Sequence, residues 1–228
     1  MMISVIIPCY NEQNTLKKST EKIFKYFENK KIDYEIIFIN NASTDNTLHV
    51  LNDLSKDYKI IILDEPKKGK GNAVKKGLLN ATFDKVLIID ADLSTDINEL
   101  KEEWLSLENI MLIGSRYLGN EIKTPFLRRL SGFILNSIIR FFFKTKIRDT
   151  QCGFKFISSK DIYDLSMELS IEGFMYDLDL IYSCFKKSID VVEIPIKYIF
   201  HSNSSVSLLR DPVVMLIDML TIRKKFRN

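Results

Sequence analysis

The chain has 228 residues, of which 46% are hydrophobic and 28% charged, and its formal net charge is +3. This balance is typical of a folded globular protein and excludes an intrinsically disordered chain. So small a net charge gives no indication of a nucleic-acid partner, and none is expected. The length suits one domain spanning residues 1–228.

The first hundred residues alternate short apolar runs with segments of helical spacing. The runs are rich in Ile and Val and almost continuously apolar, as in strands that are buried on both faces of a parallel sheet. Strands are predicted at residues 4–7, 34–39, 59–63 and 85–89. Helices are predicted at residues 12–27, 45–54 and 71–79. Repeated β-α units indicate a Rossmann-like α/β fold, with an open, mostly parallel sheet flanked by helices.

The second half is less regular. Further strands are predicted at residues 110–113, 153–157 and 191–196. Residues 125–146 read as a helix that mixes phenylalanines with arginines and lysines, and an apolar stretch ending in a basic tail covers residues 212–226. Both segments are predicted to be amphipathic helices at a membrane interface, although the first also suits a core helix with a solvated basic face. No run reaches the roughly 18 apolar residues that span a bilayer.

Polar segments follow the first four predicted strands. They are residues 8–12, 40–45, 66–72 and 90–92. In open α/β sheets, ligands bind beyond the carboxyl ends of the strands. The sequence therefore predicts a ligand site at this edge of the sheet.

Asp90 and Asp92 come directly after a buried strand. Two carboxylates in one cleft repel each other unless a cation is present. Mg²⁺ or Mn²⁺ would resolve the repulsion and could bridge the carboxylates to a substrate diphosphate. The alternative is a solvated turn in which Asp92 caps the next helix.

The turn at residues 68–71, Lys-Gly-Lys-Gly, precedes a predicted helix. It matches neither a P-loop nor the G-x-G-x-x-G fingerprint, which disfavours a dinucleotide-binding dehydrogenase. A basic turn at a helix start suits an anion. It also suits a plain surface loop.

Six motifs occur together in order along the chain. They are Pro8-Cys9-Tyr10-Asn11-Glu12, Ser43-Thr44-Asp45, Gly69-Lys70-Gly71-Asn72-Ala73, Asp90-Ala91-Asp92-Leu93-Ser94, Gly114-Ser115-Arg116 and Asp149-Thr150-Gln151-Cys152-Gly153-Phe154-Lys155. This set resembles the family-2 glycosyltransferases of GT-A fold. Within them it is most similar to the polyprenyl-phosphate sugar transferases, the group of the dolichyl-phosphate β-glucosyltransferases and, more distantly, the dolichyl-phosphate mannose synthases.

The resemblance implies a role for each matching position. The catalytic set is Asp90, Asp92 and Arg116, and the ligands of Mg²⁺ or Mn²⁺ are Asp90, Asp92 and Ser94. The nucleotide set is Pro8, Tyr10, Glu12, Ile39, Asn41, Lys70, Asp90 and Ala91. The acceptor set is Arg128, Arg129, Asp149, Gln151, Lys155 and Arg210. Residues 1–115 would then form the nucleotide-sugar half and residues 116–228 the acceptor half.

The chain departs from the family pattern at two places. Asn40-Asn41 stands where the family usually has two aspartates. Since Asn41 has one carbonyl acceptor and an NH₂ donor, it fits the single N3–H of uracil better than guanine, so we expect a UDP-sugar. Near the C-terminus residues 204–207 lack the lysine of many relatives, and Arg210, Lys197 or His201 could compensate.

The resemblance implies an inverting transfer of a hexose from a nucleotide sugar, UDP-glucose before GDP-mannose, to a polyprenyl phosphate. A phosphate monoester has a second pKa of about 6 and needs no general base. A soluble sugar or protein acceptor would need one, with Asp177 or Asp179 available. A non-catalytic nucleotide-sugar-binding module is the remaining alternative.

The expected location is the cytoplasm, at the cytoplasmic face of a membrane. The scattered Cys9, Cys152 and Cys184 form no C-x-x-C pair, which indicates reduced thiols. The expected partners are the nucleotide sugar, a dolichyl-type phosphate and the membrane surface. An integral membrane protein is a further candidate partner.

Overall fold

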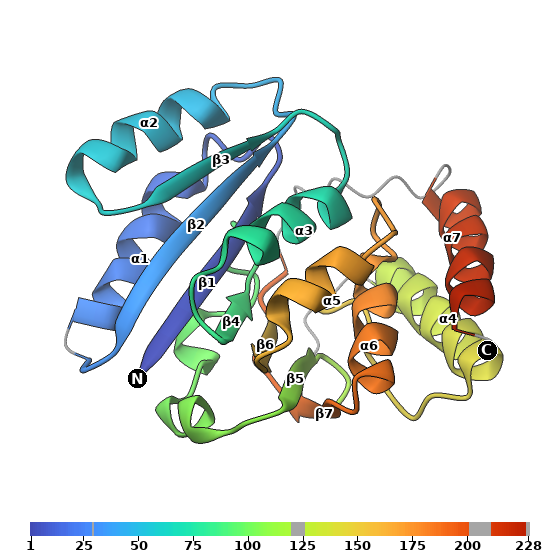
Figure 1. Ribbon diagram of the computed structural model, residues 1–228. Helices are drawn as coiled ribbons and strands as arrows, with labels where there is room; N and C mark the ends of the chain where they lie inside the picture. The colour runs from blue at the N-terminus through green and yellow to red at the C-terminus, as the bar shows by residue number, and fades with distance from the viewer. Residues whose placement is uncertain (29, 120–125, 201–210, 227–228) are drawn as a thin grey trace.

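A computed structural model of the protein describes residues 1–28, 30–119, 126–200 and 211–226 (Figure 1). The first half is built from β1 (Met2–Cys9), α1 (Leu16–Glu28), β2 (Asp33–Asn41), α2 (Thr47–Asp57), β3 (Ile61–Glu65), α3 (Lys70–Asn80) and β4 (Lys85–Ile88). The four predicted strands are confirmed, although β3 begins two residues later than expected and continues to Glu65.

The second half adds two short 3-10 helices, three strands and four α-helices. They are η1 (Ile97–Glu99), η2 (Glu102–Ser106), β5 (Ile110–Ser115), α4 (Phe126–Phe143), β6 (Lys155–Ser158), α5 (Ile162–Glu168), α6 (Tyr176–Lys186), β7 (Asp190–Pro195) and α7 (Asp211–Lys225). Helices occur at both segments predicted to be amphipathic. α5 and α6 were not predicted from the sequence.

The seven strands form one sheet in the order β3-β2-β1-β4-β6-β5-β7. Its neighbours are parallel except at β6, which runs antiparallel to both β4 and β5. The predicted α/β fold with a mostly parallel sheet is therefore confirmed. Because β6 lies between β4 and β5, the strand that follows residues 149–154 begins beside the carboxyl end of β4.

Each face of the sheet carries its own hydrophobic core. Val5 and Ile7 of β1 point to the face covered by α1 and α2, whereas Ile6 points to the face covered by α3. This alternation follows from the two-residue period of a strand. Figure 1 shows α3, α5 and α6 together on one side of the sheet, with α4 and α7 side by side beyond them.

The two outer helices leave many apolar side chains in contact with solvent. On α4 and α7 the exposed ones are Leu130, Phe133, Ile134, Phe141, Phe142, Val214, Leu216, Ile217 and Leu220. Ile139, Met219 and Ile222 are the buried apolar residues described on these helices, and they attach them to the rest of the protein. None of the helices in the described ranges is both long enough and apolar enough to cross a bilayer.

Candidate functional site

Three tight turns meet at the carboxyl ends of β1, β2 and β4. Asn11, Ala42 and Leu93 each adopt the left-handed backbone conformation there, with φ of 57°, 52° and 49°. This conformation is uncommon for residues other than glycine, and such strained positions cluster at functional sites. The edge at which the sequence analysis placed a ligand site is therefore also where the backbone is strained.

Asp90 and Asp92 follow β4 in a turn closed by a hydrogen bond from Leu93 N to Asp90 O of 3.0 Å. The backbone N–H and the hydroxyl of Ser94 both donate to the Asp92 carboxylate, at 2.9 and 2.7 Å. Ile199 N in turn donates to Ser94 O at 2.7 Å, so the chain after β7 crosses this turn. The three residues predicted as metal ligands thus lie in one turn.

The Asp90 carboxylate is held from two sides. The Lys70 ammonium lies 2.5 Å from Asp90 Oδ1, and a Cβ placed on Gly153 would lie only 1.9 Å from Asp90 Oδ2. Burial opposes the charged form of Asp90, but Lys70, Lys155 and Arg116 together outweigh it, and the pKa of Asp90 is lowered. The contact with Gly153 was not predicted, although its place in the Asp149–Lys155 motif was noted.

A second ion pair lies beneath the first. Lys155 and Asp177 are fully buried, with Lys155 Nζ 2.5 Å from Asp177 Oδ1, and Lys155 also donates to Cys152 O. Burial raises the pKa of Asp177, although Lys155 and Lys70 act in the opposite direction. The Lys155 side chain has no solvent access in this structure, and its role at the acceptor stays a prediction.

Arg116 forms a fork-to-fork pair with Asp149. Its Nε lies 2.7 Å from Asp149 Oδ2 and its Nη2 2.8 Å from Oδ1, while the guanidinium covers the ring of Tyr198 at 5.4 Å. Asp149 is fully buried, and Arg116 keeps 26% of its side chain exposed. Asp149 therefore orients Arg116, and its role at the acceptor stays a prediction. Tyr198 gave no signal in the sequence.

Tyr10 and Glu12, predicted for the nucleotide, lie half-buried in the turn after β1. The Lys68 ammonium donates to the Tyr10 hydroxyl at 2.7 Å. Burial, together with the charges of Asp92 and Asp90, outweighs the hydrogen bond from Thr15 and raises the pKa of Glu12. Glu12 and the two aspartates therefore concentrate negative charge in one place.

Asn41, expected to bind the base, is 4% exposed and engaged with the loop after β3. Its amide donates to Lys67 O at 2.8 Å, and its oxygen accepts from Gly69 N at 2.9 Å. The acceptor assigned to uracil N3–H thus already has a donor. Its placement indicates that Asn41 fixes the conformation of this loop.

Three other members of the predicted nucleotide set have little side-chain access. Ile39 and Ala91 belong to the two buried cores, and Pro8 is half-buried within β1. Any contact of Ile39 or Ala91 with a ligand would have to use the backbone.

The predicted acceptor residues are described in part. Gln151 is half-buried, and its Nε2 is buried without a hydrogen-bond partner in the described part of the chain, which leaves a donor available. The side chains of Arg128 and Arg129, and all of Arg210, His201 and residues 204–207, lie outside the described residues.

The donor set around Asp90 and Asp92 suits a hard cation. Two carboxylates and the Ser94 hydroxyl offer the oxygen ligands that Mg²⁺ and Mn²⁺ prefer. Within the described ranges no three His, Cys, Asp or Glu side chains gather closely enough to hold a metal by themselves. A cation here would therefore need oxygens from a substrate or water, and would share the Asp90 carboxylate with Lys70 or compete with it.

A protein-family model and individual relatives both indicate a sugar transferase. The model of the family described as glycosyl transferase family 2 matches residues 4–165. A dolichyl-phosphate beta-glucosyltransferase of Trichomonas vaginalis is 29% identical over 242 residues, covering 99% of this chain and 74% of the relative. That of Saccharomyces cerevisiae is 28% identical, covering 99% of this chain and 75% of the relative.

Among solved structures the fold is similar to glucosyl-3-phosphoglycerate synthase from Mycobacterium tuberculosis in complex with Mn²⁺ and UDP-glucose. The TM-score is 0.69 at 17% identity, and the match covers 96% of this chain and 78% of the other. At this identity the likeness concerns the fold, which is that of the GT-A glycosyltransferases.

Proposed function

Because the chain belongs to glycosyltransferase family 2, we propose that it transfers a glucosyl group from UDP-glucose to the phosphate of dolichyl phosphate or a related polyprenyl phosphate. The observation that carries the proposal is the turn after β4, where Asp90 and Asp92 lie beside Lys70. The names of the relatives, which are dolichyl-phosphate glucosyltransferases, support the acceptor and the sugar. UDP bound to the structural neighbour supports the nucleotide.

In the proposed reaction an oxygen of the acceptor phosphate forms a bond with the anomeric carbon. The bond from that carbon to the leaving diphosphate breaks, the electron pair leaves with UDP, and the configuration inverts. The acceptor phosphate is already ionised at neutral pH, so it needs no general base. This agrees with Asp177 and Asp179, both of which are buried and engaged in ion pairs.

The protein's part in this reaction is to bind and orient. Lys70 and Arg116 place positive charge beside the carboxylate turn, where the diphosphate becomes more negative as it leaves. Asp90, Asp92 and Ser94 would hold Mg²⁺ or Mn²⁺, which would supply further neutralisation of the diphosphate. Residues 1–115 would bind the nucleotide sugar and residues 116–228 the acceptor.

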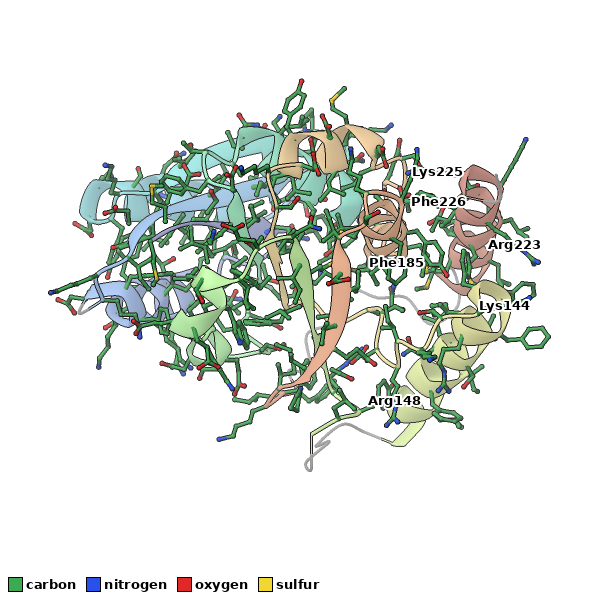
Figure 2. The ribbon with its side chains drawn as sticks, turned by 60° about the horizontal axis from the view of Figure 1, so that its bottom comes forward. Lys144, Arg148, Phe185, Arg223, Lys225 and Phe226 are labelled. Atoms are coloured by element: carbon green, nitrogen blue, oxygen red, sulfur yellow. The ribbon has the colours of Figure 1, made fainter. Side chains whose placement is uncertain are left out.

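We also propose that the protein binds peripherally to the cytoplasmic face of a membrane. The exposed apolar side chains of α4 and α7 lie beside basic residues, among them Lys144, Arg148 and Arg223 (Figure 2). An apolar surface rimmed by Lys and Arg fits the interface of an anionic bilayer. A polyprenyl acceptor, which is confined to the bilayer, would then be within reach.

The test is to supply UDP-glucose or GDP-mannose with a short polyprenyl phosphate and Mn²⁺, and to measure sugar in the lipid-extractable product. We expect transfer from UDP-glucose and loss of transfer with EDTA. Asp92→Ala should transfer sugar at least about a hundredfold more slowly, which is the rate loss typical of removing one electrostatic contact from an active site. A fully active Asp92→Ala would refute the metal site. Transfer only to a water-soluble acceptor would refute the lipid acceptor, and preference for GDP-mannose would refute the donor.

A further inference from the structure

The backbone of residues 171–172 presses against the glycine–lysine turn that begins α3. Gly71 N and Asn72 N both donate to Glu172 O, at 2.8 and 3.3 Å. A Cβ on Gly71 would lie 2.1 Å from Ile171 O, and one on Gly69 2.3 Å from Glu172 O. The amides of Gly71 and Asn72 are therefore occupied, and the turn is fixed by a segment a hundred residues away in the sequence.

That segment is held in place by Asp179 of α6. Asp179 Oδ2 accepts hydrogen bonds from Ser170 N at 2.7 Å, from Ser170 Oγ at 3.1 Å and from Ile171 N at 3.2 Å. Its side chain has no exposed surface. A buried carboxylate is tolerated only when its charge and lone pairs are satisfied. Asp179 is thus a structural tether and not a general base.

The remaining oxygen of Asp179 is bound by the last turn of α7. Lys225 Nζ lies 2.5 Å from Asp179 Oδ1 and also donates to Glu168 O. Beside it, the ring of Phe226 lies 5.7 Å from that of Tyr182. Figure 2 shows Lys225 and Phe226 on the side of α7 that faces α6.

These contacts form one continuous path from α7 to Asp90. Lys225 binds Asp179, Asp179 holds Ser170 and Ile171, and Glu172 O holds the turn that carries Lys70. The Lys70 ammonium then lies on Asp90. The links are ion pairs, hydrogen bonds and short stretches of backbone, and such contiguous contacts are the physical means by which two sites can be coupled.

We propose that the Lys225–Asp179 pair is a positioning device that keeps Lys70 and its turn in the geometry that binds the nucleotide diphosphate. The inference rests on the proposed function, which it deepens by linking the nucleotide site to α7. Without Lys225, the buried Asp179 charge loses its cation, and the segment it holds loosens. Nucleotide binding should weaken, whereas the rate at saturating nucleotide should change little.

The experiment compares Lys225→Met with Lys224→Met in the full chain. Lys224 is the matched control, because it is an exposed lysine in the same helical turn and its loss changes the net charge equally. Isothermal titration with UDP and Mn²⁺ should show UDP binding about 2- to 30-fold weaker for Lys225→Met, and unchanged UDP binding for Lys224→Met. This range corresponds to the free energies by which residues between two sites modulate the coupling of those sites. Lys225→Arg, which keeps the cation, should restore the affinity.

Amide hydrogen exchange tests the path without any ligand. The amides of Gly71 and Asn72 should exchange faster in Lys225→Met than in the wild type and remain protected in Lys224→Met. If Lys225→Met does not fold, Lys225→Gln serves, since it removes the charge but keeps a donor. Unchanged exchange and unchanged UDP affinity would overturn the positioning device. A wild type that binds no UDP would instead overturn the proposed function, whatever the exchange data show.

Discussion

Gly153 is one of the places where the second half of the chain touches the carboxylate turn. Its backbone lies against Asp90, and a Cβ there would fall 1.9 Å from Asp90 Oδ2 and 2.4 Å from its Cγ. No L-side chain fits unless the carboxylate or the backbone moves. The glycine thus sets the position of Asp90 by leaving room for it.

We therefore predict that Gly153→Ala lowers sugar transfer at least tenfold by displacing Asp90. Gly173→Ala is the control, since its Cβ would meet nothing nearer than Asp218 Oδ2 at 3.6 Å. Transfer assays and Mn²⁺ titration of both variants, with thermal unfolding to confirm folding, give the comparison. Wild-type metal affinity and transfer in a folded Gly153→Ala would show that Asp90 does not depend on this contact.

At the residue scale, the sequence predicts the residues of the β4 turn because they are neighbours in the chain. Asp90, Asp92 and Ser94 lie together as expected. The ligand roles predicted for Asp149, Lys155 and Asn41 stay predictions, and the sequence did not reveal that each of these side chains has a protein partner brought by tertiary packing. The presence of a buried Asp177 below Lys155 cannot be recognised from residue types alone.

At the scale of elements, α4 and α7 carry exposed apolar side chains that do not contribute to a hydrophobic core. Phe141 is 81% exposed on α4, and its ring touches only that of Phe142, at 5.7 Å, among the aromatic contacts described. Arg223 of α7 covers the Phe142 ring at 5.5 Å. Aromatic and basic side chains thus share one surface across two helices.

We predict that Phe141→Asp weakens sedimentation with anionic liposomes at low salt, with little change in the melting temperature. Burial of a phenylalanine in the interface contributes about 1.5–3 kcal/mol, and an acidic residue would add repulsion from the lipid. Leu48→Asp is the control, as Leu48 is an exposed apolar residue of α2 at the opposite end of the molecule (Figure 1). Equal sedimentation of Phe141→Asp and wild type would argue against this surface.

The elements that the sequence predicts are those with a clear local pattern, either a continuous apolar run or a helical period. The apolar strands of the first half and the long helix α4 have such patterns, and they are found with small shifts at their ends. α6 has none, because eight of its residues are buried, Asp177 and Asp179 among them. The antiparallel direction of β6 has no local signal either, since a buried strand has the same pattern in both directions.

At the scale of the whole molecule, β6 joins the two halves of the sheet and brings a lysine into the core. Lys155 pairs with β4 and β5 through its backbone, at Ile88 and Ile113, and its side chain reaches Asp177 of α6. The pair is fully buried, so neither charge can be solvated by water if the other is removed. The junction between strand and helix therefore depends on both charges.

We predict that Lys155→Met lowers the free energy of unfolding by about 3–5 kcal/mol, the cost of leaving a buried charge without its partner. The double variant Lys155→Met with Asp177→Leu should be less destabilised than the sum of its single variants, because the apolar pair leaves no orphan charge. Urea unfolding of the wild type, the two single variants and the double variant measures the coupling. Strictly additive losses would mean that the two charges do not stabilise each other, and that packing alone holds β6 against α6.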